Sequence, residues 1–219
     1  MKTYQKHDVV SFLKTKEAFG GLSNMAAGYP ITLYGIRCRS SEHLYQALKF
    51  PEHPELQSQI LSVASPMGAK MVAKKHRKLI RPDWEEIKLP VMAYCLRAKL
   101  STNSEAFGDL LRSTGDADIV EISSKHDTYW GCVPQGDVLV GHNHLGVLLT
   151  NLRDGLVDSK GGFRMTLLAP PKGIELRLTE RRLEVIDFED DVEAFLQDIL
   201  VAIYARNSAQ QANATIGGF

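Results

Sequence analysis

Residues 40–50 constrain the fold more than any other stretch, because they combine a helix start with two faces of opposite character. Ser40 or Ser41 can cap the first turn, since a serine oxygen accepts one of its free N–H groups. An apolar stripe at helical spacing is formed by Leu44, Ala47 and Leu48. At roughly 100° per residue, a second face collects Glu42, Gln46 and Lys49. This polar face is either a solvent-exposed helix surface or the wall of a polar pocket.

The composition is that of an ordinary globular protein. The chain has 219 residues, of which 44% are hydrophobic and 24% charged, and its formal net charge is zero. The neutral balance does not indicate a protein that grips a long nucleic-acid backbone. The three cysteines form no CxxC pair, and no stretch approaches the ~20 apolar residues of a membrane span. We therefore expect a soluble, cytoplasmic protein with reduced thiols and no membrane partner.

Hydrophobic periodicity predicts a helix-rich α+β domain over residues 1–157. Helices are expected over 40–50, 55–63, 66–77, 84–96, 103–112 and 145–156. The fourth of these has a capping-box pattern at Asp83 and Glu86, and Pro90 predicts a kink or break within it. Strands are expected at 9–13, at 119–122 and in a hairpin over 31–38, whereas the Gly- and Pro-containing stretch 127–141 predicts a loop. We expect the hairpin and the 119–122 strand to form one small, mostly antiparallel sheet.

The character of the chain changes after Asp158. Three short strands are expected within 158–207, at 163–168, 174–178 and 183–188. An amphipathic helix is expected to follow Asp190, with a capping residue at Glu193 and an apolar face that needs a partner surface. Residues 158–207 therefore form a predicted C-terminal extension of strands and one helix, and the polar stretch 208–219 predicts a disordered tail.

A second candidate site lies in the sequence Asp127-Thr128-Tyr129-Trp130-Gly131. Aromatic side chains in a glycine-flanked loop can stack on a flat ligand such as a base, and a neighbouring aspartate can transfer a proton. The alternative interpretation is a loop that Trp130 anchors to the core. Lysines and arginines between Lys70 and Arg81 can hold phosphate or form a solvated helix face, and Arg81 is the most constrained of them.

Several other chemistries have no support in the sequence. The pair His142 and His144, with Cys132 and Asp137 nearby, matches no strong zinc pattern, so we expect no metal site. Phosphate-binding and nucleophile-elbow motifs are absent from the sequence, and we expect no cofactor.

Asn143 precedes a predicted helix as a candidate cap, and Gly146 permits close approach of another segment.

Taken together, the motifs resemble the NADAR superfamily of N-glycosidases. The resemblance runs from about Leu22 to Leu156 and is carried by Leu22-Ser23-Asn24, Ser41-Glu42-His43-x-Tyr45-Gln46-Ala47-x-Lys49-Phe50, Ser65-Pro66, Ala69-Lys70, Asp83-Trp84, Leu96-Arg97-Ala98-Lys99, Thr114-Gly115, Glu121, Asp127-x-Tyr129-Trp130-Gly131, Asn143-x-Leu145-Gly146 and Leu152-Arg153. Each motif is weak alone, but their common order over this length is specific.

The resemblance implies hydrolysis of the C1–N bond between ribose and an aminated heterocycle. Family members are linked to ribosylaminopyrimidine phosphates of early riboflavin synthesis and to ADP-ribose attached to guanine in nucleic acid. It implies Lys49 as the residue that traps the sugar C1 as a Schiff base, and Glu42 and Asp127 as acid/base or charge-stabilising groups. The implied substrate contacts are Trp130, Tyr45, Asn24, Gly131, Lys70, Arg81, Trp84 and Asn143.

Two other functional classes remain open at this point. The chain can be an ADP-ribose or nucleotide-binding module without catalysis, although binding alone does not require both an amine and two carboxylates. It can also be an interaction protein in which residues 159–219 recruit a partner and the preceding domain is a scaffold.

Overall fold

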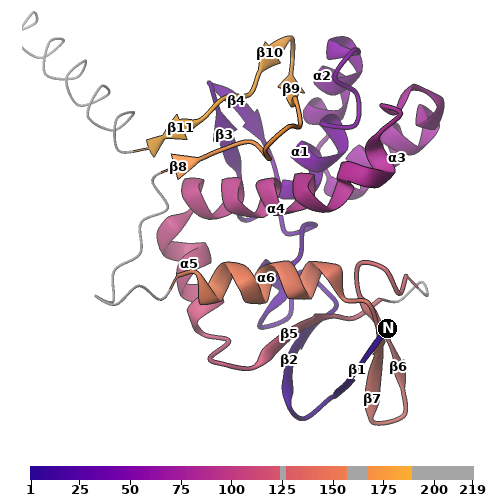
Figure 1. Ribbon diagram of the computed structural model, residues 1–219, viewed down its shortest axis with the longest axis vertical. Coiled ribbons are helices and arrows are strands. Elements are labelled where there is room, and N and C mark those ends of the chain that lie inside the picture. The colour runs from indigo at the N-terminus through magenta and orange to yellow at the C-terminus, as the bar shows by residue number, and fades with distance from the viewer. Residues whose placement is uncertain (124–126, 157–166, 189–219) are drawn as a thin grey trace, which may run out of the picture.

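The computed structural model describes residues 1–123, 127–156 and 167–188, and its elements are shown in Figure 1. Its α-helices are α1 (Ser41–Ala47), α2 (Pro54–Ser62), α3 (Pro66–Lys75), α4 (Trp84–Thr102), α5 (Ser104–Arg112) and α6 (His144–Asp154). Its strands are β1 (Lys2–Gln5), β2 (Val9–Phe12), β3 (Ile31–Leu33), β4 (Ile36–Cys38), β5 (Asp118–Glu121), β6 (Cys132–Gln135), β7 (Val138–Gly141), β8 (Leu167–Leu168), β9 (Arg177–Leu178), β10 (Arg181–Arg182) and β11 (Ile186–Asp187). The predicted helix-rich α+β class is therefore confirmed.

The long helix α4 lies across the middle of the molecule, with α1, α2, α3 and the β3–β4 hairpin on one side and α6 with β1, β2, β5, β6 and β7 on the other (Figure 1). The strands form separate small sheets rather than one. β1, β7 and β6 make a three-stranded antiparallel sheet, β2 pairs with β5 in parallel, and β3 pairs with β4 and with no other strand of the described residues. The predicted joint sheet of the hairpin and the 119–122 strand is therefore wrong.

Two further expectations need correction. Residues 132–141 form the hairpin β6–β7 instead of a loop, because Cys132–Gln135 pairs with Val138–Gly141 across a turn at Gly136, and β7 also pairs with β1. Of the kink or break expected at Pro90, the break does not occur, because helix α4 continues through this residue, although proline removes one helical hydrogen bond at a cost of about 3 kcal/mol or more. Apolar packing on both sides of Pro90, at Ile87 and Val91, is consistent with the helix being maintained.

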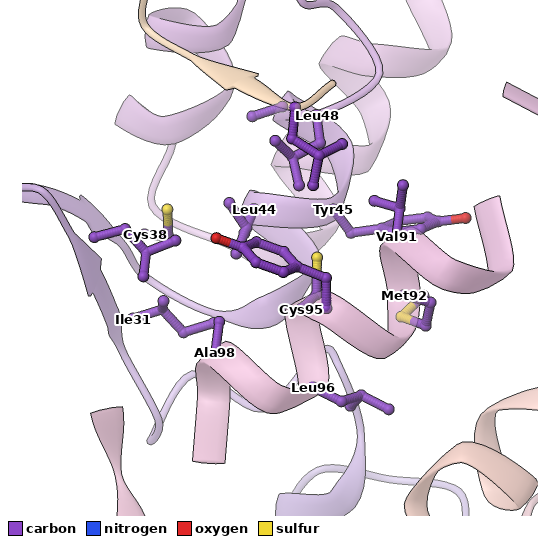
Figure 2. Close-up of a cluster of buried hydrophobic side chains, with 14 of the residues drawn as sticks. Ile31, Cys38, Leu44, Tyr45, Leu48, Val91, Met92, Cys95, Leu96 and Ala98 are labelled. Atoms are coloured by element: carbon purple, nitrogen blue, oxygen red, sulfur yellow. The ribbon is translucent and has the colours of Figure 1, made fainter. Parts of the chain in front are cut away.

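The core is built where α1 packs against α4 and the β3–β4 hairpin. Figure 2 shows Leu44 of α1 and Leu48, which follows that helix, on the side that faces Val91 and Cys95 of α4, with Ile31 of the hairpin near Cys38 and Ala98. The apolar stripe predicted for residues 40–50 is thus the side that faces this core. Ser40 caps the helix, because its side-chain oxygen accepts the backbone N–H of His43 at 3.4 Å.

Residues 167–188 pack into the same core, and we call them the C-terminal arm. Their buried side chains are Leu168, Leu176, Leu178, Leu183 and Ile186. The side-chain amide of Gln57 on α2 donates to the carbonyl oxygen of Arg177 at 2.8 Å, and its oxygen accepts the backbone N–H of Thr179. The division into a domain ending at 157 and an extension stays a prediction. The predicted helix after Asp190 and the tail 208–219 lie outside the described residues.

No helix in the described ranges combines the length and the apolar character needed to cross a bilayer.

Candidate active site

A pocket of about 310 Å³ brings together side chains from segments far apart in the sequence. The residues that line it are Ser23, Asn24, Met25, Glu42, Tyr45, Gln46, Lys49, Lys70, Trp84, Glu85, Lys88, Met92, Glu121, Asp127, Trp130 and Leu145. It includes eight of the eleven residues proposed from the sequence, counting Asn24, Glu42, Tyr45, Lys49, Lys70, Trp84, Asp127 and Trp130. The polar face of residues 40–50 is therefore a pocket wall and not a solvated surface.

Helix α1 contributes a buried polar pair to this wall. Glu42 is only 6% exposed and Gln46 only 3%, and the Gln46 amide donates to a Glu42 carboxylate oxygen at 2.8 Å. The two side chains lie one helical turn apart, so the amide is fixed where it can stabilise the charge of the carboxylate. Glu42 also lies in the first turn, where the helix N-terminus favours a negative charge.

Lys49 lies just beyond the end of α1, and its backbone carbonyl accepts the N–H of Arg81 at 2.9 Å. Its ammonium nitrogen is 5.2 Å from the ring centre of Tyr45 and 5.3 Å from that of Trp84. Burial lowers the pKa of Lys49 to about 8, against the opposing attraction of Glu42. In the described part of the chain, no carboxylate comes within ion-pair distance of this amine. A fraction of the amine is therefore neutral near neutral pH.

Aromatic rings form a continuous group along one side of the pocket. Tyr45 contacts Trp84, with ring centres 5.0 Å apart, and its edge meets Trp130 at 5.9 Å and 87°. Tyr45 and Trp84 are buried, whereas Trp130 is partly exposed. Because the buried rings support Trp130, its remaining surface is available to a flat ligand.

Asp127 stabilises the loop that carries this tryptophan. One of its carboxylate oxygens accepts the backbone N–H groups of Tyr129 at 3.0 Å and Trp130 at 3.1 Å. Such an aspartate turn fixes the direction of the following residues and leaves the second carboxylate oxygen for other contacts. Asp127 is thus both a structural group and a pocket residue.

Three residues proposed as substrate contacts are not among the pocket-lining residues. Arg81 binds the carboxylate of Asp83 through Nε at 2.6 Å and the carbonyl oxygen of Glu175 at 2.8 Å. The Asp83 carboxylate is therefore engaged by Arg81 and forms no side-chain cap for α4, so the predicted capping box is wrong. Gly131 and Asn143 are buried and are in contact with strand β5.

Asn143 is the residue before α6, but it does not cap the helix through its side chain. Its side-chain oxygen accepts the backbone N–H of Glu121 at 3.1 Å, and its amide donates to the carbonyl oxygen of Ile119 at 2.8 Å. Its backbone is left-handed, with φ of 55°, a conformation that asparagine tolerates better than most residues. Asn143 therefore joins α6 to β5. A side chain at Gly146 would meet the carbonyl oxygen of Ile119, which confirms the predicted close approach.

The residues proposed from the sequence as catalytic groups or substrate contacts omitted Glu121, Glu85 and Lys88, whereas Gln46 was already assigned to the polar face that forms the pocket wall. Glu121 is the last residue of β5, and the available signal was a carboxyl group placed where a buried strand ends. Lys88 pairs with Glu85 at 2.5 Å and lies 4.0 Å from the ring centre of Tyr129.

In the described ranges, no cluster of three or more metal-ligating side chains occurs, and the rings of His142 and His144 stack with their centres 5.6 Å apart.

The NADAR domain model matches residues 11–157 of this sequence, which is most of the chain. The chain belongs to the NADAR family. Its NADAR region includes every pocket-lining residue, whereas the C-terminal arm lies outside the match.

The relatives of this NADAR chain include bacterial and plant proteins. It is 37% identical over 152 residues to "N-glycosidase YbiA" of Escherichia coli (strain K12), which covers 69% of this chain and 91% of that protein. It is 34% identical over 151 residues to "Riboflavin biosynthesis protein VVA0006" of Vibrio vulnificus, where the match covers 68% of this chain but 39% of that protein. The NMR structure of E. coli YbiA superimposes with a TM-score of 0.58 at 37% identity, covering 68% of this chain and 85% of YbiA.

Proposed function

We propose that the protein is an N-glycosidase that hydrolyses the C1–N bond between a ribosyl group and a guanine-like base. The observation that carries this proposal is the placement of the Lys49 amine in one pocket with Glu42 and Asp127. Breaking a ribosyl C1–N bond builds positive charge on the sugar and requires a nucleophile at C1. In this pocket the amine can act as the nucleophile, and the two carboxylates can stabilise the positive charge on the sugar. The N-glycosidase names of relatives such as E. coli YbiA support the same reaction.

Lys49 is the proposed nucleophile. Its amine must be neutral to attack, and its pKa of about 8, lowered by burial, provides the neutral form at moderate pH. Attack on C1 releases the base, and opening of the sugar ring then gives an imine between C1 and the lysine nitrogen. Water hydrolyses the imine, which returns the free amine and the sugar aldehyde.

The remaining pocket residues divide between charge stabilisation and binding. Glu42 and Asp127 stabilise the positive charge that develops on the sugar. Trp130, supported by Tyr45, stacks on the base, and Asn24 offers its side-chain oxygen, which is buried and has no hydrogen-bond partner in the described part of the protein. Lys70 on α3 lines the pocket and is the proposed contact for a phosphate group.

Two substrates fit this chemistry. One is a ribosylaminopyrimidine phosphate, which the riboflavin biosynthesis names of the Vibrio and maize relatives support. The other is ADP-ribose attached to guanine in nucleic acid. Both contain a ribosyl C1–N bond, a phosphate on the sugar and a guanine-like ring, so the same pocket chemistry serves either.

The deciding experiment is a direct comparison of the two substrates. The protein is incubated with an ADP-ribosylated guanine oligonucleotide and, separately, with a ribosylaminopyrimidine phosphate. Release of ADP-ribose or ribose 5-phosphate is measured. We expect turnover of at least one of them, and reduction with borohydride during turnover should attach the sugar to Lys49, as mass spectrometry of peptides detects.

Variants of Lys49 separate catalysis from binding. Lys49→Ala and Lys49→Arg should lose turnover and borohydride trapping, because alanine has no amine and an arginine side chain stays protonated. Lys74→Ala on α3 is a matched control that removes an exposed lysine outside the pocket. Binding of both substrates without turnover of either would replace this proposal with a non-catalytic binding module.

A further inference from the structure

Glu121 is a third carboxyl group in the pocket, and it has no part in the nucleophilic, charge-stabilising and binding roles proposed for the other pocket residues. It ends strand β5 and lines the pocket together with Glu42 from α1 and Asp127 from the following loop. Hydrolysis of a C1–N bond needs one further function, a proton for the departing nitrogen. The three carboxyl groups are chemically alike, so their surroundings decide which of them holds that proton.

The hydrogen bonds of the three groups differ. Glu42 accepts the Gln46 amide, and Asp127 accepts two backbone N–H groups. Donors of this kind stabilise negative charge, so both side chains are suited to act as carboxylates. Across the described residues, no donor or cation lies within bonding distance of the Glu121 carboxyl group. Of the three carboxyl groups, Glu121 therefore has the least stabilisation for a negative charge.

Its electrostatic surroundings act in the same direction. Burial, followed by the charges of Asp127 and Glu42, raises the pKa of Glu121 to about 7, and only Lys70 opposes this shift. The charged groups that face it across the pocket are Glu42 from α1, Lys49 just beyond the end of α1, Lys70 from α3, Glu85 and Lys88 from α4, and Asp127 from the loop. A carboxyl group whose pKa lies near neutrality is suited to general acid catalysis.

The backbone of Glu121 is held from two sides. Asn143 accepts its N–H at 3.1 Å, and a side chain added at Gly131 would lie 2.6 Å from its carbonyl oxygen. The position next to Glu121 therefore requires a residue without a side chain at 131 and a hydrogen-bond acceptor at 143, and neither role needs contact with a substrate. Both act as positioning residues for the end of β5.

We propose that Glu121 is the general acid that protonates the departing base. This inference rests on the proposed N-glycosidase function. As the neutral Lys49 amine forms a bond to C1, the electron pair of the C1–N bond stays on the base nitrogen. The carboxyl proton of Glu121 moves to that nitrogen, and the base leaves neutral. The new C1–ammonium then returns a proton to the Glu121 carboxylate, which restores the acid before the sugar opens to the imine.

The test is the pH dependence of kcat for wild type, Glu121→Gln and Glu121→Asp, on whichever of the two proposed substrates the wild type turns over. Wild type needs neutral Lys49 and protonated Glu121, so kcat should fall at both low and high pH. Glu121→Gln should lower kcat by about 10²-fold or more, keep KM within about threefold and lose the decline at high pH. Glu121→Asp keeps a carboxyl group and should retain some activity with both limbs of the profile.

Asp118→Asn is the matched control, because Asp118 is an exposed carboxylate on the same strand and lies outside the pocket. A carbon-13 NMR titration of the labelled Glu121 carboxyl group measures its protonation without any substrate. An active wild type with an unchanged kcat profile in Glu121→Gln, or a Glu121 titration near pH 4.5, overturns this inference and leaves the N-glycosidase proposal standing. Absence of wild-type turnover overturns both.

Discussion

The backbone N–H of Arg81 donates a hydrogen bond to the carbonyl oxygen of Lys49, with 2.9 Å between the two atoms. The side chain of Arg81 simultaneously binds Asp83 and the carbonyl oxygen of Glu175 in the C-terminal arm. Arg81 therefore connects the end of α1, where the proposed nucleophile lies, to a segment outside the NADAR match. The backbone bond persists whatever side chain occupies position 81, which separates its two roles experimentally.

Replacing Arg81 by alanine should lower stability more than catalysis. We expect a loss of about 1–2 kcal/mol in the free energy of unfolding, because a partly buried charge pair and a bond to a carbonyl oxygen disappear. At temperatures where the variant stays folded, kcat/KM should remain within about threefold of wild type. Urea unfolding and initial rates measure the two quantities. A hundredfold loss of kcat/KM without loss of stability would instead indicate a substrate contact.

Gln57 should be essential for attaching the C-terminal arm. Its fully buried amide donates to the carbonyl oxygens of Ala47 at 3.1 Å and Arg177 at 2.8 Å, and its oxygen accepts the N–H of Thr179 at 2.6 Å. Gln57→Leu leaves these groups unpaired and should cost about 2–4 kcal/mol in urea unfolding. Gln59→Leu, at an exposed position of the same helix, is the control and should change stability by less than about 0.5 kcal/mol.

Gly131→Ala should disturb the pocket by displacing the backbone of Glu121. The added methyl group would lie 2.6 Å from the carbonyl oxygen of Glu121, so the backbone must shift. We expect a loss of about 1–3 kcal/mol in unfolding free energy and a reduced kcat, since Glu121 moves with its strand. Gly28→Ala meets no atom within 4 Å and serves as the control. Equal stability and kcat in both variants would contradict the predicted shift.

The lowered pKa of Lys49 can be measured without a substrate. A lysine reacts with an amine-selective reagent only in its neutral form, and burial lowers the pKa of Lys49 to about 8. Peptide mapping after brief labelling should show that modification of Lys49 rises with pH through a midpoint of about 8. Exposed Lys74, labelled in the same sample, provides the comparison. A midpoint near 10.5 for Lys49 would contradict the effect of burial.

Lys99 should make stability depend on pH. Its buried ammonium group donates to the carbonyl oxygens of Gly21 at 2.5 Å and Ser23 at 3.2 Å, and it lies over the rings of Tyr29 and Phe107. Burial lowers its pKa from 10.5 to about 7. Between these values the unfolded chain binds a proton that the folded chain does not, so stability rises with pH.

The expected size of this effect is at most ~1.4 kcal/mol per pH unit. Urea unfolding of wild type and Lys99→Met at pH 7 and pH 9 measures it, because the variant has no titrating group at this position. Wild type should gain stability relative to the variant as the pH rises. A constant difference would show that the folded protein retains the proton on Lys99.

Local chemistry made much of the fold predictable. Ser40 was expected as a cap from its place before an apolar periodic stretch, and its side-chain oxygen accepts an N–H of the first helical turn. The hairpin over 31–38 was equally predictable, and the structure confirms it with a two-residue turn in which Tyr34 and Gly35 both have positive φ. Such signals depend on neighbours within a few residues, so the linear sequence contains them.

Expectations that depended on distant partners were less successful. The break at Pro90 failed because α4 is packed along its length. The capping box at Asp83 is a local exception, because Arg81, two residues earlier, binds the carboxylate. The hairpin β6–β7 was missed because Gly136 and Pro134 suggested a loop, whereas pairing of β7 with β1 stabilises it from the far end of the chain. Pairing over such distances leaves no local signature.

The sequence by itself determined the helix of residues 41–47, the side of it that is buried, and the set of polar residues that includes Glu42 and Lys49. Only the tertiary structure decided that Lys49, Asp127 and Glu121 share one pocket, and that Arg81 and Asn143 support it from outside. The physical reason is that capping and amphipathic spacing act over one or two helical turns. Burial, charge proximity and a missing hydrogen-bond donor arise only when separate segments meet.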